Sequence, residues 1–348
     1  MIVLEEHPGM ELVQCIESNG TVWSTKGRNI QRREQGRQWQ SYASFPWTAP
    51  RDFFSINRIG RRVARADMSS VFVTSCSHVL GIRAGVVFRV ERNQLHALGE
   101  ISGDIPLAGG FCEDTDCQIY FGEYFLNPMR NPVRVWRIRP DLRGLEVAWE
   151  FPEKSVRHVH SVCLDPYDSG VIWVATGDDT NECYLWRTND QFQTLERFGD
   201  GTQAWRAVTI YFTEEYVSWI TDSHLAPNYA MRFARGTGEV ETGQPFPASV
   251  WFGTKTMDGI FVAMTTVEKG PGILRSQASI YVSRDAFHWQ EIQAFDKDGW
   301  RPYSLFKAGV IYCPVGSMTS ERFWLSGQGL VGFDGCTRLV DLEVAAVS

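Results

Sequence analysis

Residues 203–223 read QAWRAVTIYFTEEYVSWITDS, and this stretch decides the fold. An apolar segment is followed by the polar turn TEEY and by a second apolar segment. The more polar sequence NYAMRFARGTGEVETGQPFP follows over residues 228–247. Short apolar runs bounded by turn residues are typical of buried strands, and alternating runs are typical of strands with one exposed face. The unit therefore predicts two buried strands followed by two outer strands.

The same unit recurs along the chain. The preceding copy contains VRHVHSVCLDP and VIWVATGDD within residues 156–179, and the following copy contains SVWFGTKT and IFVAMTTVE within residues 249–268. Blades stacked radially around an axis produce this gradient from an apolar interior to a polar rim. The sequence therefore predicts an all-β chain in which 1–348 form a single β-propeller, most simply with seven four-stranded blades. Their approximate ranges are 1–51, 52–104, 105–153, 154–201, 202–248, 249–298 and 299–348. The first unit is irregular, so six or eight blades, or two packed sandwiches, stay open as alternatives.

Composition narrows the classes of partner. The net charge is −7, whereas a general nucleic-acid binder usually carries a basic face. No window approaches the roughly 18 apolar residues that span a bilayer. The N-terminus lacks the basic and long apolar regions of a secretory signal. We therefore expect a cytoplasmic protein without nucleic-acid or membrane partners, and the sequence leaves its oligomeric state open.

Eight cysteines are present, and none forms a C-x-x-C pair. This absence argues against zinc-ribbon and thioredoxin motifs. Cys112 and Cys117 flank an acidic turn, so a disulfide across that hairpin is one alternative. Free thiols in a reducing compartment are the other.

Two outer hairpins contain a related turn. Residues 188–195 read TNDQFQTL and residues 283–289 read SRDAFHW. The Ser/Thr and Asp side chains of such turns cap backbone amides, and the terminal apolar group packs beneath them. Both segments resemble the Asp-box pattern S/T-x-D-x-G-x-T-W/F of the BNR repeats in the sialidase superfamily. That resemblance implies a propeller fold and, in many members, action on glycans, while the boxes themselves are structural there.

Four further segments carry a wider resemblance. FGEYF (121–125), RHVHSV (157–162), QAWRAV (203–208) and TDS (221–223) are similar to a group of BNR-like proteins encoded among polysaccharide genes. The resemblance implies a saccharide partner. The F-R-I-P element of sialidases has no counterpart, and no motif assigns three of Arg58, Arg157, Arg206 and Arg301 to an arginine triad.

Propeller geometry brings distant residues to one face, because the start of each first strand and the end of each second strand emerge together. Ionisable groups next to apolar strands are costly unless they are paired, so their concentration favours a site or a charge network. The residues at second-strand ends are His78, Glu123, Tyr124, Asp178, Asp179, Asp222, His224 and Glu268. The residues at first-strand starts are Arg157, His158, His160, Gln203, Trp205 and Arg206.

Each residue has a structural alternative. His158 and His160 alternate along a strand and are metal ligands, an acid–base pair, or histidines hydrogen-bonded between blades. Arg157 and Arg206 clamp a substrate carboxylate or tie blades together. Asp178 and Asp179 are interpreted as turn formers. Trp205 is a sugar-stacking platform or a packing residue.

Three functions follow from this set. In the first, a lyase eliminates across a uronate: Arg157 or Arg206 neutralises the carboxylate, His158 or His160 removes the adjacent proton, and Tyr124 protonates the leaving oxygen. In the second, a sialidase-like hydrolase uses carboxylates from Glu123, Asp222 and Glu268. In the third, the same face binds a glycan or a protein without catalysis.

The candidates divide by role. The catalytic set is His158, His160, Tyr124 and Glu123. The substrate-binding set is Arg157, Arg206, Gln203, Asp222, Glu268 and Trp205. The sequence assigns no cofactor, and His158 and His160 with His224, Asp222 or Gln203 form an alternative site for a divalent metal ion.

Overall fold

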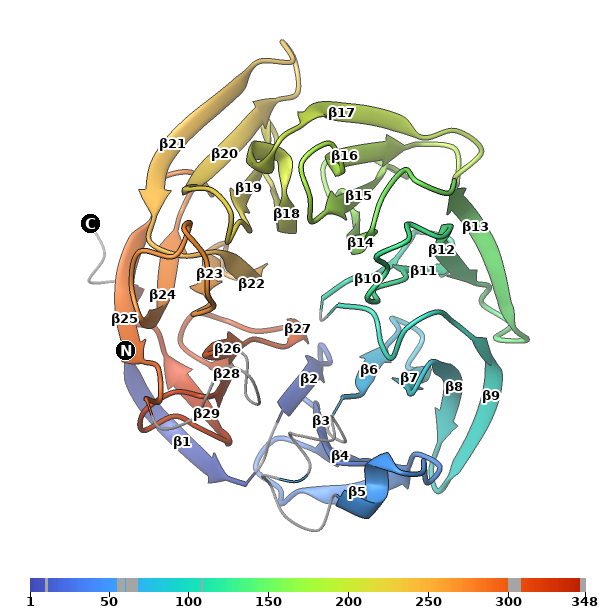
Figure 1. The fold of residues 1–348 in the computed structure, drawn as a ribbon. Coiled ribbons are helices and arrows are strands. Elements are labelled where there is room, and N and C mark those ends of the chain that lie inside the picture. The colour runs from blue at the N-terminus through green and yellow to red at the C-terminus, as the bar shows by residue number, and fades with distance from the viewer. Residues whose placement is uncertain (10–11, 55–59, 61–67, 108, 300–307, 345–348) are drawn as a thin grey trace.

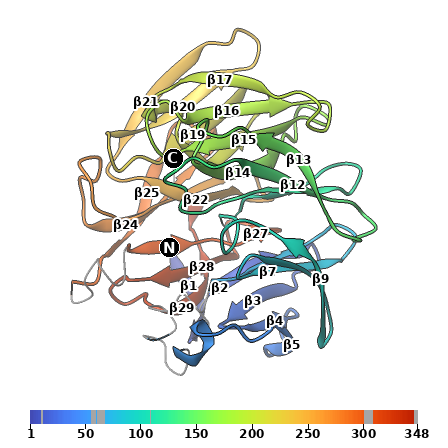
Figure 2. The ribbon, with the colours of Figure 1, turned by 45° about the vertical axis from the view of Figure 1, so that its right-hand side comes forward.

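The protein is described by a computed structural model that covers residues 1–9, 12–54, 60, 68–107, 109–299 and 308–344 (Figure 1). Seven β-sheets stand in a ring around a central axis (Figure 1 and Figure 2). The seven-bladed β-propeller predicted from the repeat is therefore confirmed.

Each blade is an antiparallel sheet, and in the second to sixth blades the strands follow chain order. The first blade comprises β2 (Leu12–Ile16), β3 (Val22–Lys26), β4 (Asn29–Arg33) and β5 (Gln40–Ser44). The second comprises β6 (Ser70–Val73), β7 (Val79–Arg83), β8 (Val86–Glu91) and β9 (Gln94–Glu100). The third comprises β10 (Phe111–Glu113), β11 (Ile119–Gly122), β12 (Val133–Ile138) and β13 (Leu145–Phe151).

The remaining blades continue the ring. The fourth comprises β14 (His158–Leu164), β15 (Ile172–Gly177), β16 (Cys183–Thr188) and β17 (Glu196–Gly201). The fifth comprises β18 (Ala207–Phe212), β19 (Tyr216–Thr221), β20 (Asn228–Ala234) and β21 (Val240–Phe246). The sixth comprises β22 (Val250–Lys255), β23 (Phe261–Thr265), β24 (Gln277–Ser283) and β25 (Gln290–Asp296). Short 3-10 helices cover Arg51–Phe54 and Gln203–Trp205.

The two ends of the chain build the seventh blade together. It comprises β26 (Val310–Tyr312), β28 (Phe323–Gln328), β29 (Cys336–Asp341) and, as its outermost strand, β1 (Ile2–Pro8). In addition, β27 (Val315–Gly316) pairs in parallel with β2 of the first blade. Residues 2–8 thus belong to the seventh blade and not to the first unit (1–51), and this exchange closes the ring.

The apolar core lies between neighbouring blades. Val135 of the third blade and Val174 of the fourth are fully buried in one cluster, and Trp173 and Trp219 join the fourth blade to the fifth in another. This arrangement is why the first two strands of each unit are apolar on both faces. In the described part of the chain, no helix is long and apolar enough to cross a membrane.

The two related turns of the outer hairpins are capped locally. Thr188 Oγ1 accepts from the Phe192 amide at 3.1 Å, and Asp190 Oδ1 accepts from the Thr194 amide at 3.0 Å. In the second turn, Asp285 Oδ1 accepts from the amides of Phe287 and His288 at 3.0 and 2.8 Å. Within the turn these backbone amides have no carbonyl partner, and the side-chain oxygens accept their hydrogen bonds instead.

Candidate functional site

The fourth blade places two histidines at the start of its inner strand. His158 pairs with Gly177 at the end of β15, and the register shifts between Val159 and Ser161, so His160 is the extra residue of a β-bulge. Bulges often re-aim side chains beside functional sites. Gly177 is required here, because a Cβ at this position would lie 2.9 Å from His160 Cε1 and 3.3 Å from Arg206 Cγ.

Three ligand-type atoms form a nearly equilateral triangle. His158 Nε2 and His160 Nε2 are 3.1 Å apart. Asp178 Oδ1 lies 3.3 Å from His158 Nε2 and 3.2 Å from His160 Nε2. Asp178 follows β15 directly, so the second-strand end and the first-strand start of one blade supply all three groups.

The other ring nitrogens fix the tautomers of the two histidines. His158 Nδ1 lies 3.1 Å from the Phe125 carbonyl, and His160 Nδ1 lies 2.8 Å from the Ala207 carbonyl. A carbonyl only accepts, so each Nδ1 carries the hydrogen, and each neutral ring presents a lone pair at Nε2. Two lone pairs and a carboxylate oxygen repel one another at these distances. The triangle therefore requires a cation or additional protons between its members.

Two arginines surround the carboxylate. Arg206 Nη2 lies 2.9 Å from Asp178 Oδ1, and its Nε donates to Asp222 Oδ2 at 3.2 Å. Arg157 Nη1 lies 3.2 Å from Asp178 Oδ2. Together these residues form the axial cluster, which we define as Tyr124, Arg157, His158, His160, Asp178, Arg206 and Asp222. Its members come from the third, fourth and fifth blades and lie on inner strands or the adjoining loops (Figure 1).

Burial and charge shift the protonation of the cluster in opposite directions. Burial lowers the pKa of His160 despite the nearby Asp178 carboxylate. Burial alone would raise the pKa of Asp178, but the hydrogen bonds that His158 and His160 donate when Nε2 is protonated hold it well below its usual range. Burial raises the pKa of Asp222 to about 8 although Arg206 lies beside it. At neutral pH the cluster therefore contains an ionised Asp178 and a largely protonated Asp222.

Tyr124 covers the histidines. Its ring centroid lies 4.2 Å from that of His158 and 6.2 Å from that of His160. Burial, followed by the charge of Asp178, raises the pKa of the Tyr124 hydroxyl, so the phenol keeps its proton. The side chains of Arg157 and Asp178 are 23% and 15% exposed and Tyr124 is partly buried, while the side chains of His158 and His160 are 4% and 1% exposed. A ligand arriving from solvent therefore meets Arg157 first.

Glu123, expected among the catalytic residues, has another role. Its buried carboxylate accepts from the amides of Ser102 and Arg134 at 2.9 Å each and from Trp136 Nε1 at 3.1 Å. Three N–H donors satisfy a carboxylate of this kind. Glu123 thus anchors the third blade to the link that follows the second blade, and its hydrogen bonds lead away from the histidines, which corrects the expectation.

Two further candidates support the cluster from behind. Gln203 Nε2 donates to the Asp178 carbonyl at 2.8 Å, and its Oε1 accepts from Ser223 Oγ at 2.7 Å. Trp205 stacks on Trp219 with ring centroids 5.0 Å apart. Gln203 thus positions the Asp178 backbone, and the partly buried Trp205 packs on Trp219, which favours the packing role that the sequence left open for it.

The remaining candidates lie at different distances from the cluster. Glu268 accepts from Ser249 Oγ at 2.5 Å, and its charge acts on both Arg206 and Asp222. In the described part of the chain, the third ligand-type side chain beside His158 and His160 is Asp178 and not His224, which the sequence offered for that position. His78 lies in the turn between β6 and β7, at the opposite end of the strands from the cluster. Asp179 pairs with Arg130 of the third blade.

Sequence reasoning undervalued Asp178. It follows the glycine that ends β15, which suggested a turn, although β15 is the strand paired with His158. The expected pairing of the two inner strands could have identified Asp178 as a neighbour of His158. Arg58 and Arg301, considered for carboxylate binding, lie outside the described residues. The disulfide alternative for Cys112 and Cys117 is wrong, since both are free thiols and Cys112 is buried.

Known proteins are similar to this chain in fold alone. A scan against protein-family models finds no match, and a search of curated proteins finds no relative. A chain of a mitotic checkpoint complex superposes with a TM-score of 0.58 at 8% identity, over 97% of this chain and 94% of that one. An oligogalacturonate lyase in complex with manganese gives 0.54 at 9% identity, over 85% and 80%. A GH74 xyloglucanase from Xanthomonas campestris gives 0.56 at 12% identity, over 83% of this chain and 47% of that one.

Fold and site together define a class: a seven-bladed β-propeller with a buried cluster of histidines, carboxylates and arginines beside its axis.

Proposed function

We propose that this propeller acts on an acidic saccharide by elimination, with a divalent cation held by His158, His160 and Asp178. The observation that carries the proposal is the triangle of His158 Nε2, His160 Nε2 and Asp178 Oδ1, with sides of 3.1 to 3.3 Å. A solved propeller neighbour that is a uronate lyase was crystallised with manganese, which supports the proposal by analogy of fold. Kinship with the Asp-box propellers of the sialidase superfamily is part of the same proposal.

The donor set fits a divalent cation. Two imidazole nitrogens and one carboxylate oxygen form a triad that leaves further coordination positions open. With metal–ligand bonds of roughly 2.1 Å, ligands at right angles lie about 3 Å apart, close to the observed sides. Arg206 uses only one lone pair of Asp178 Oδ1, so another stays available. A cation held there would supply positive charge near the carboxylate of a bound uronate.

The chain's own residues supply substrate binding and the proton donor; the proton removed from the substrate would pass to hydroxide from solvent and leave as water, and Tyr124 would regain its proton from solvent. Arg157 is the partly exposed cation of the cluster and suits pairing with a substrate carboxylate. The Tyr124 phenol retains its proton and suits the donor that protonates the leaving oxygen. His158 and His160 hold the cation in this scheme, so they do not also accept the substrate proton through the same nitrogens. The hydrolase alternative loses Glu123, whose carboxylate is occupied within the third blade.

An absorbance assay tests the proposal. Oligogalacturonides are incubated with manganese-loaded protein, and we expect ultraviolet absorbance from an unsaturated uronate. His158→Asn should reduce the rate on the order of 100-fold, since loss of even an indirect metal contact costs 10- to 100-fold. His96→Asn, which changes an exposed histidine on β9, is the matched control and should retain full activity. Binding without product would favour a non-catalytic propeller, and saturated products would favour a hydrolase.

A further inference from the structure

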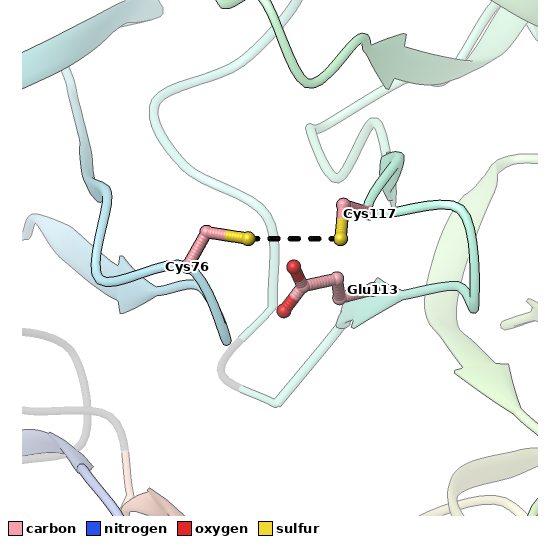
Figure 3. Close-up of side chains that lie close together, drawn as sticks. All are labelled: Cys76, Glu113 and Cys117. Atoms are coloured by element: carbon pink, nitrogen blue, oxygen red, sulfur yellow. Dashed lines mark hydrogen bonds between the residues drawn. The ribbon is translucent and has the colours of Figure 1, made fainter.

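A second group of metal-ligand side chains lies in the turns that join first to second strands. Cys76 belongs to the turn between β6 and β7 of the second blade, and Glu113 and Cys117 flank the turn between β10 and β11 of the third. The axial cluster lies at the other end of these inner strands. Figure 3 shows the two thiols and the carboxylate directed toward one another across the gap between the blades. We call these three residues the thiol cluster.

The spacing of the thiol cluster matches shared coordination. The Sγ atoms of Cys76 and Cys117 are 3.7 Å apart, and the ligand atoms of all three residues lie within 4.8 Å of one another. Two thiolates bound to one tetrahedral zinc ion at 2.3 Å lie about 3.8 Å apart. A disulfide would bring the sulfurs to about 2.05 Å. The two thiols therefore are not joined by a disulfide; they are within hydrogen-bonding distance, at a separation that also suits two ligands of one ion.

The carboxylate is held in position before any ion arrives. Glu113 Oε2 accepts from the Ser75 amide at 2.6 Å, and Oε1 accepts from Ser75 Oγ at 2.9 Å. Each oxygen keeps a second lone pair for a metal. Among the described residues, no arginine or lysine forms an ion pair with Glu113. The cluster is thus acidic in character and has no fixed cation of its own.

We infer that the thiol cluster is a site for a thiophilic divalent cation, zinc foremost, that links the second blade to the third. Zinc forms two Zn–S bonds and one Zn–O bond here, and water completes the fourth position. The two thiols release their protons to solvent, no group is oxidised or reduced, and the bound unit carries one net negative charge. Because both thiols must lose their protons before they bind the ion, binding weakens as pH falls.

Cobalt binding tests this inference with a sulfur-specific signal. Protein is stripped of metal, kept reduced with a phosphine, and titrated with Co²⁺. We expect thiolate-to-cobalt charge-transfer absorption that saturates at one ion per chain and is lost when zinc is added. The axial cluster offers nitrogen and oxygen ligands only, so it gives no such band. Failure of this inference is therefore distinguishable from failure of the proposed function.

Variants assign the signal to the three residues. Cys76→Ser and Cys117→Ser should abolish the band, while Glu113→Gln should keep it and weaken cobalt affinity about 10-fold. Two controls on the same hairpin should leave it unchanged: Cys112→Ala removes a buried thiol, and Asp116→Asn removes an exposed carboxylate. A band that survives in Cys76→Ser would overturn the inference. So would a Cys76–Cys117 disulfide in protein purified with zinc and without reductant.

Discussion

The axial cluster and the thiol cluster both gather metal ligands between blades, yet their surroundings differ. His158 and His160 are buried and face Arg206 and Asp222, which are also buried. Cys76 is exposed, and the thiol cluster is built from two surface turns. A buried group of charges must be balanced internally, whereas an exposed group is balanced by solvent. The axial cluster is therefore tied to folding, and the thiol cluster is an addition that the fold tolerates with or without a ligand.

The largest expected effect follows from removing the charge that balances the axial cluster. Arg206→Met leaves Asp178 and Asp222 without their shared cation, and we expect a loss of about 3–5 kcal/mol in the free energy of unfolding. Urea denaturation measures it. Arg187→Met, which breaks an exposed pair with Glu196, is the control and should cost less than about 1 kcal/mol. Similar costs for the two variants would contradict the comparison.

Asp222 should make stability depend on pH. Its folded pKa of about 8 lies above the unfolded value of about 3.9, so the folded protein binds more protons between these values. Stability is therefore highest near the lower end and declines toward pH 8, by up to about 1.4 kcal/mol per pH unit. Asp222→Asn should remove the slope in urea denaturation at pH 5, 6.5 and 8. A slope that persists in this variant would assign the effect to another group.

Gly177 tests how closely the axial cluster is packed. In Gly177→Ala the new methyl meets His160 Cε1 and Arg206 Cγ, and we expect a loss of about 1–3 kcal/mol because the inner strand must shift. Manganese affinity should fall with it. Gly236→Ala is the matched control, because a methyl group at this glycine meets open space, and it should leave manganese affinity unchanged. Gly170→Ala is unsuitable as a control, because the φ of Gly170 is positive. Unchanged manganese affinity in Gly177→Ala would show that His160 can move freely.

The thiol cluster should give the smallest effect on folding. Without metal, Cys76→Ser changes an exposed side chain, and we expect the free energy of unfolding to change by less than about 0.5 kcal/mol. In an Asp178→Asn background, where the axial cluster is weakened, saturating zinc should raise the thermal midpoint of protein with intact thiols and not that of Cys76→Ser. A large loss of stability in metal-free Cys76→Ser would show that folding depends on the thiol cluster, as it does on the axial cluster, and would contradict the comparison.

The fold was largely predictable, because two apolar strands followed by two alternating strands recur at each blade. The exception is β1, whose partner β29 lies at the other end of the chain. Nothing local in IVLEEHP indicates which blade it joins. Ring closure is a long-range contact that local patterns do not encode.

The site was predictable in position more than in detail. His158, Arg157, Arg206, Asp222 and Tyr124 meet because strand ends share a face, which propeller geometry implies. Side-chain direction was not readable from the sequence: Glu123 neighbours Tyr124, and yet its carboxylate binds Ser102 and Trp136 and not the histidines. The Cys76–Cys117 approach also escaped notice, since it joins turns of two different blades.

Manganese binding to the axial cluster tests the central claim most directly. The measurement uses protein that carries Cys76→Ser and Cys117→Ser, so the thiol cluster cannot contribute, and follows binding by calorimetry and electron paramagnetic resonance. We predict one bound ion per chain, with affinity reduced at least about 10-fold by Asp178→Asn and retained in Asp179→Asn. No binding, or equal binding in both carboxamide variants, would contradict the account.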